Sequence, residues 1–239
     1  SAGTSNFRAG VNAGNSIVSG GNYNTVVGDE AGTAITTGDS NTGVGFGAVK
    51  AATTGSQNVG VGVNALATVT TASYNTALGT SALTANTSGA SNVAVGTNAL
   101  EANTTASNNT AVGKSALLNN TTGAYNTAVG ALAGDGATTA SYSTALGYGS
   151  LGGAMTGEGN VALGVNTLLV ATSAHSNTAV GTSAMSSATT GTNNVAVGRN
   201  ALDANTTASN NTAVGYASLG ANTTGASNVA VGKHSMLAN

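Results

Sequence analysis

Cysteine, proline and tryptophan are all missing from this chain of 239 residues. Without cysteine the chain forms no disulfide and no thiolate metal site. Without proline no backbone N–H group is lost, and this suits a continuous ladder of backbone hydrogen bonds. The absences therefore favour a fold that depends on its backbone rather than on covalent or metal cross-links.

Charge is also sparse, with five basic and seven acidic residues in the whole chain. Binding to nucleic acid needs clustered lysine and arginine, because these displace counterions from the phosphates. Five scattered basic residues form no such cluster, so we expect no nucleic-acid partner. No apolar stretch approaches the length of a membrane span, so we expect no membrane insertion either.

What the chain does contain is a seventeen-residue unit that repeats thirteen times without a slip. Its first position is taken by Asn24, Asn41, Asn58, Asn75, Asn92, Asn109, Asn126, Ser143, Asn160, Asn177, Asn194, Asn211 and Asn228. An unbroken register indicates that each unit stacks directly on the next. The sequence therefore predicts a solenoid over residues 24–239, and residues 1–23, which break the register, predict an N-terminal cap or partial coil.

We number the positions of the unit as columns 1 to 17, starting from each of those anchoring residues. Columns 2 and 4 are apolar or β-branched around a small residue, as in 93–95, which is the alternation of a strand. Columns 9, 11 and 13, for example Leu100, Ala102 and Thr104, predict a weaker second strand. Two strands and two turns per unit predict an all-β fold, a parallel β-solenoid (β-roll) of about thirteen coils.

Two columns predict the turns of the coil. Column 5 is glycine in all thirteen units, which predicts a positive φ or a close backbone approach there. Column 1 asparagines can bond local backbone and stack on the same residue one coil away. Column 15 alternates between glycine and alanine, so a physical coil could contain 34 residues; we favour 17, because each unit already holds every strand and turn.

Column 3 contains almost only glycine and alanine. Because its neighbours are expected to point inward, column 3 is expected to point outward, where tiny side chains would let another backbone approach closely. The alternative is that they reflect only tight turns and a thin coil. The candidate self-association face consists of Gly43, Gly60, Ala77, Ala94, Ala111, Ala128, Ala145, Ala162, Ala179, Ala196, Ala213 and Ala230.

Column 14 is a rank of hydroxyl side chains that is predicted to face outward if column 13 faces inward. Hydroxyls repeated at the coil spacing on a flat, uncharged face could order water, with the column 12 residues Asn103 and Asn205 beside them. An ordinary threonine ladder that needs no ligand is the alternative. The candidate ice-binding or ligand face consists of Thr37, Thr54, Thr71, Ser88, Thr105, Thr122, Thr139, Thr156, Ser173, Thr190, Thr207 and Thr224.

The chemistry of catalysis is not apparent in the sequence. His175 and His234 are isolated in variable columns, and no acidic pair recurs as a general acid and base would require. We therefore expect no enzyme activity, no catalytic residue, no cofactor and no metal site. Exposed aromatic residues in columns 6 and 17, such as Tyr148 and Tyr125, could stack on sugars, contact a partner or pack over a neighbouring turn.

Residues 91–96, Ser-Asn-Val-Ala-Val-Gly, recur at 227–232 and resemble the Ser-Val-Ala-Ile-Gly motif of YadA-type head repeats. Those repeats belong to trimeric autotransporter adhesins, whose heads are parallel β-rolls of three chains. The longer pattern at 109–125 resembles repeats of phage tail-fibre proteins. The resemblance implies a homotrimer, a cell-surface glycan or receptor as target, and an extracellular location at the cell surface or on a virion.

Two functions remain in competition from the sequence. The first is an elongated structural and adhesive fibre segment of a phage tail fibre or a bacterial surface adhesin. The second is an ice-binding (antifreeze) solenoid that uses the column 14 face. Burial of column 3 against a sister chain would favour the fibre, whereas a flat, exposed column 14 would favour ice binding.

Overall fold

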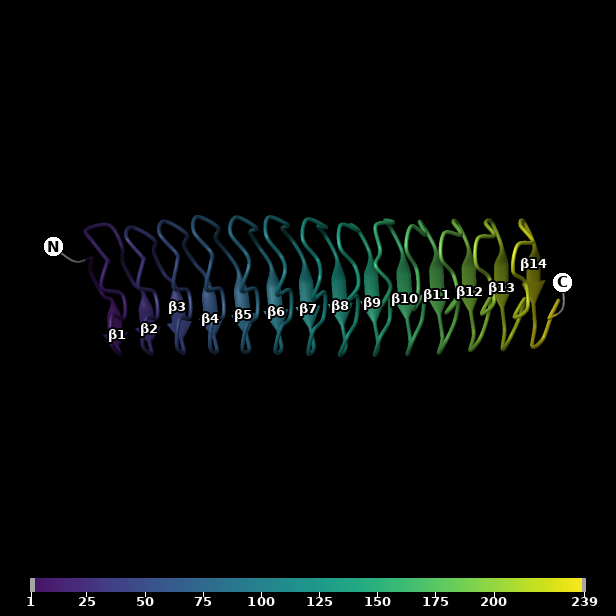
Figure 1. Cartoon of the computed structure of the whole chain (residues 1–239), viewed down its shortest axis with the longest axis horizontal. Helices are drawn as coiled ribbons and strands as arrows, with labels where there is room; N and C mark the ends of the chain where they lie inside the picture. Colours follow the sequence, from purple (N-terminus) through teal and green to yellow (C-terminus); the bar gives the residue numbers. More distant parts are fainter. Residues whose placement is uncertain (1–2, 238–239) are drawn as a thin grey trace. The chain divides into compact units, whose positions relative to one another are not determined.

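The structure is a computed structural model and describes residues 3–237. The first two residues of the predicted cap and the last two of the repeat region lie outside the described residues. The chain divides into two compact units, Ser1–Thr122 and Gly123–Asn239. Each unit contains seven three-residue strands, and no helix occurs between residues 3 and 237 (Figure 1).

The strands occupy columns 2 to 4 of successive coils. Those of the first unit are β1 (Phe7–Ala9), β2 (Thr25–Val27), β3 (Thr42–Val44), β4 (Val59–Val61), β5 (Thr76–Leu78), β6 (Val93–Val95) and β7 (Thr110–Val112). Those of the second are β8 (Thr127–Val129), β9 (Thr144–Leu146), β10 (Val161–Leu163), β11 (Thr178–Val180), β12 (Val195–Val197), β13 (Thr212–Val214) and β14 (Val229–Val231).

Within each unit every strand pairs in parallel with the strand of the next coil. Val93 lies opposite Thr76 on one side and Thr110 on the other, an offset of seventeen residues in each direction. The predicted parallel β-solenoid is therefore confirmed within each unit, with a coil of 17 rather than 34 residues. Phe7 lies opposite Thr25, an offset of eighteen, so the segment before Asn24 forms a further coil with one extra residue; its capping role stays a prediction.

The predicted second strand is wrong. Leu100 has a φ of 52°, in the left-handed region, and column 9 adopts this conformation in coil after coil. Such a backbone is not extended, yet it still bonds the next coil: the Leu100 N–H donates to Ala116 O at 3.0 Å and the Ala102 N–H to Leu118 O at 3.0 Å. The alternation of columns 9, 11 and 13 therefore marks an irregular segment whose backbone groups are satisfied between coils.

The glycine of column 5 ends each strand as predicted. Its φ lies between 122° and 139° in all thirteen units, a conformation that side chains with a Cβ rarely adopt. The backbones of successive coils also approach closely there. A Cβ built on Gly198 would lie 2.4 Å from the carbonyl oxygen of Gly215. Both reasons offered by the sequence for an invariant glycine therefore apply at this column.

The column 1 asparagines form the predicted ladder inside each unit. The side-chain oxygen of Asn41 accepts the N–H of Asn58 at 3.0 Å and its Nδ2 at 3.1 Å. The Nδ2 of Asn41 donates to Gly55 O, in column 15 of the same coil, at 2.8 Å. Where Ser143 replaces asparagine, its Oγ accepts the Asn160 N–H at 3.3 Å. The column thus closes each coil and joins it to its neighbour.

Column 3 points into the core, so the predicted outward orientation is wrong. Gly43 and Gly60 are buried, and the ten alanines from Ala77 to Ala230 are at most 2% exposed. The cause is the thin coil, because column 9 side chains occupy the space opposite: a Cβ on Gly60 would lie 2.8 Å from Val49 Cγ2. These side chains lie inside their own coil and cannot form a self-association face.

Candidate functional site

With column 3 inside, columns 2 and 4 of strands β2 to β14 face outward; we call their side chains the strand face. Column 2 carries threonine or valine, and column 4 carries valine or leucine. Leu78 in the first unit is 38% exposed, and Leu163 and Val197 in the second are 39% and 36% exposed. No strand from β2 to β14 contains a charged residue. Several other side chains of columns 2 and 4 are half-buried, so each unit presents a partly open, uncharged surface with regularly spaced β-branched and aliphatic side chains.

Such a surface is unusual for a sheet of parallel strands. Parallel sheets occur almost only with both of their faces covered. Here the coil interior covers one face, and nothing in residues 3–237 covers the other. Contiguous exposed apolar patches on soluble proteins mark sites of interaction. The strand face is therefore the most prominent candidate binding surface in each unit.

The column 14 hydroxyls form the second candidate surface, and their binding of ice or another ligand stays a prediction. Eleven of the twelve residues are exposed, and Ser173 is half-buried. Within residues 3–237 only the Thr156 hydroxyl of this set bonds to protein, donating to Thr172 O at 3.3 Å. By contrast, column 13 hydroxyls are used between coils, as where Thr53 Oγ1 donates to Thr70 O at 3.1 Å. Column 14 is thus a single file of hydroxyls that are open to water.

The asparagines expected to flank this file are elsewhere. Asn103 and Asn205 are fully buried, so their predicted place beside the column 14 face is wrong. Their Nδ2 groups each donate at 3.1 Å to a column 15 carbonyl of the same coil, Ala106 O and Ala208 O. Column 12 faces inward because this bond supports the turn. The hydroxyl file is therefore narrower than a two-column face would be.

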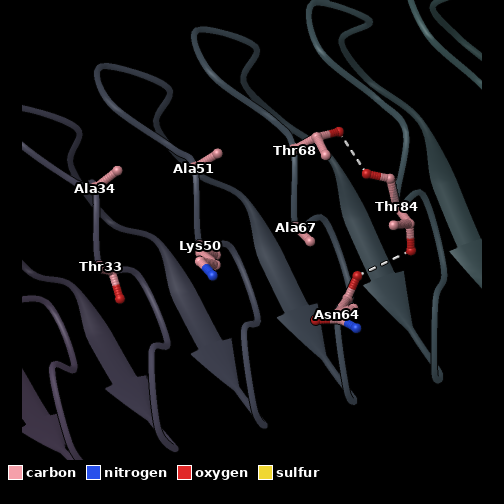
Figure 2. A pocket seen from close by; sticks show the side chains of 8 residues that line it. All are labelled: Thr33, Ala34, Lys50, Ala51, Asn64, Ala67, Thr68 and Thr84. Carbon is pink, nitrogen blue, oxygen red and sulfur yellow. Dashed lines mark hydrogen bonds between the residues drawn. The ribbon is translucent and has the colours of Figure 1, made fainter.

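A shallow groove of about 550 Å³ lies in the first unit, on columns 10 and 11 of neighbouring coils (Figure 2). Its lining consists of Thr33, Ala34, Lys50, Ala51, Asn64, Ala67, Thr68 and Thr84. Thr68 Oγ1 donates to Thr84 O, and Thr84 Oγ1 donates to Asn64 O at 3.0 Å. Lys50 is paired with Glu30 at 2.5 Å. Because these donors already have partners, the groove presents mainly methyl groups and offers little specific recognition.

The ionisable side chains of the described residues form no cluster that suits a metal ion. No group of three or more histidine, aspartate or glutamate side chains there could hold a metal ion. Burial raises the pKa of the Asp135 carboxyl above its usual value, while backbone hydrogen bonds from Gly136 and from Asp135 itself oppose this. Residues 3–237 contain no helix that is long and apolar enough to span a membrane.

Comparison with known proteins gives no assignment. No model of a known protein family matches the chain, and no curated protein matches it. The function must therefore be argued from the two surfaces.

Columns 2 and 4 were predicted to lie inside and column 3 outside, because an alternating pattern alone does not show which side of the strand faces the core. One signal could have decided between the two orientations. Val26 is the only large residue of column 3, and its coil has Gly32 at column 9, where every other coil except the one with Gly134 carries leucine, valine or methionine. A Cβ on Gly32 would lie 2.6 Å from Val26 Cγ1. This exchange of size between columns 3 and 9 indicates that both face the same interior.

Proposed function

We propose that this chain is a structural and adhesive fibre segment of a phage tail fibre or a bacterial surface adhesin, without catalytic activity. In this proposal three copies associate through the strand face, outside the cell or on a virion, and the variable edges of the coils contact a cell-surface glycan or receptor. The resemblance of residues 91–96 to YadA-type head repeats supports the trimer. The observation that carries the proposal is the open, uncharged strand face.

Self-association through this face has a physical reason. A coil has a thin core, so covering columns 2 and 4 adds to the aliphatic surface that it removes from water. Each buried aliphatic side chain contributes on the order of 1.5–3 kcal/mol. Every copy carries the same repeated pattern, so symmetric copies are complementary along the whole face. Because strands β2 to β14 contain no charge, such packing leaves no ion without a partner.

Solution mass tests this proposal, and the expected value is that of a trimer, three times the 22.4 kDa of one chain. We expect Leu163→Lys to reduce the mass to that of a monomer, because three ammonium groups would be buried together. Thr190→Lys, on the exposed column 14, is the matched control and should remain trimeric. Light scattering coupled to size-exclusion chromatography gives the masses. A wild-type monomer, or a trimeric Leu163→Lys protein, would contradict the proposal.

Ice binding is the second candidate, and the column 14 hydroxyls favour it. They repeat at the coil spacing of about 4.8 Å, carry no charge and are open to water. If this function holds, replacing Thr54 and Thr71 together by lysine should abolish inhibition of ice recrystallisation, while Leu163→Lys should leave it intact. A wild-type protein that fails to slow recrystallisation would exclude this candidate.

A further inference from the structure

One place in the second unit combines a fixed aromatic ring with an open space beside it. Tyr142, in column 17 just before strand β9, is 63% exposed. Its ring stacks on that of Tyr125 with centroids 5.2 Å apart and planes within 4° of parallel. Both residues have a left-handed backbone, with φ of 60° and 58°, so they project from equivalent positions of successive coils. An exposed ring held in this way has lost most of its freedom before any ligand arrives.

The next position in this stack has no side chain, because column 17 of the following coil is Gly159. The register is fixed by the Gly159 N–H, which donates to Ser141 O at 3.1 Å. A Cβ on Gly159 would have one neighbour within 4 Å, the Ser176 hydroxyl at 3.8 Å. Since rings stack at about the spacing of the coils, a third ring would fit here. One face of Tyr142 thus looks onto a gap about one ring thick.

Exposed polar residues adjoin Gly159 in its own coil and in the following one. Glu158, His175 and Ser176 are all exposed, and the Ser176 N–H donates to Glu158 O at 3.0 Å. The Glu158 N–H donates to His175 Nδ1 at 3.1 Å. Because Nδ1 accepts, the neutral imidazole carries its proton on Nε2, which is then a donor. The Ser176 hydroxyl therefore lies beside the space over Gly159, and Glu158 and His175 are the exposed polar residues next to it in the same coil and in the following one.

We propose that Tyr142, Glu158, His175 and Ser176 form a binding subsite for one ring of an uncharged saccharide. A pyranose has an apolar C–H face that packs on the aromatic ring and a rim of hydroxyls that bonds to the polar groups. The Glu158 carboxylate disfavours acidic sugars and nucleic-acid phosphates. This assignment rests on the proposed adhesive function and gives its ligand a chemical class and a place.

The test applies the full chain to an array of neutral, sialylated and sulfated oligosaccharides. We expect wild type to bind neutral members, and Tyr142→Ala to bind them at least tenfold more weakly. Gly159→Tyr should have the same effect, because it fills the gap and leaves Tyr142 in place; Tyr125 and Tyr142 already adopt the backbone conformation that it needs. Tyr142→Phe keeps the ring face and should bind, as should Tyr148→Ala, which removes an exposed ring of column 6.

Several results would overturn the subsite: no binding, binding of acidic glycans alone, or neutral-glycan binding that neither Tyr142→Ala nor Gly159→Tyr weakens. If Gly159→Tyr does not fold by circular dichroism, the pair Tyr142→Ala and Tyr142→Phe decides alone. The measured mass separates this proposal from the preceding one. A trimer that binds no glycan contradicts only the subsite, whereas a monomer that binds neutral glycans through Tyr142 contradicts only the trimer.

Discussion

Replacing Asn41 by alanine should lower the free energy of unfolding by about 3–5 kcal/mol, although the residue touches no candidate binding surface. Asn41 is fully buried in column 1. Its removal takes the Nδ2 donor from Gly55 O and the Oδ1 acceptor from the Asn58 N–H, two contacts of 2.8 and 3.0 Å. Both backbone groups are buried, and a buried group without a partner costs about 1–3 kcal/mol.

Thr54→Ala is the matched control, because Thr54 lies in column 14 of the same coil and its hydroxyl is exposed without a protein partner. It should change stability by no more than about 0.5 kcal/mol. Urea unfolding followed by circular dichroism compares both variants with wild type. Equal midpoints for the two variants would mean that the asparagine ladder adds no stability.

How far the sequence predicts this fold depends on the kind of signal. The strict register predicted the coil, because units that stack directly on one another keep the same length. The glycine of column 5 predicted the turn and the asparagine of column 1 predicted the ladder, because few backbone conformations or bonding patterns require either residue at every repeat. The second strand predicted at Leu100 was wrong, since an alternating pattern does not distinguish an extended backbone from one with a φ of 52°. The outward orientation predicted for Ala94 was also wrong, because alanine suits a thin core and an open surface equally.

The candidate surfaces also differ in how far the sequence predicts them. Outward exposure of column 14 was expected if column 13 faces inward, but column 13 threonines such as Thr70 and Thr87 are exposed as well. The space over Gly159 did not follow from the sequence, because its meaning depends on Tyr142 in the coil before it. A pattern indexed by column shows what repeats, whereas this subsite arises where one coil departs from the repeat. Such departures become interpretable only once neighbouring coils are placed side by side.

Gly198→Ala should be severely destabilising, costing more than about 4 kcal/mol or preventing folding. The glycine has a φ of 136°, and the added Cβ would lie 2.4 Å from Gly215 O and 2.6 Å from its carbonyl carbon. Backbone atoms of the next coil cannot move aside without breaking the ladder of hydrogen bonds between β12, which ends at Val197, and β13. Two independent penalties, conformational strain and steric overlap, therefore act at one position.

Gly159→Ala is the comparison, because it lacks the overlap and its φ lies in the left-handed region that Tyr125 and Tyr142 also adopt. Its φ is 69°, and the nearest atom to the added Cβ would be Ser176 Oγ at 3.8 Å. Strain alone should then cost about 1–2 kcal/mol. Soluble yield and urea midpoint of the two variants measure the difference. If Gly198→Ala proved no less stable than Gly159→Ala, neither the overlap nor the more restrictive φ of column 5 would carry the expected penalty.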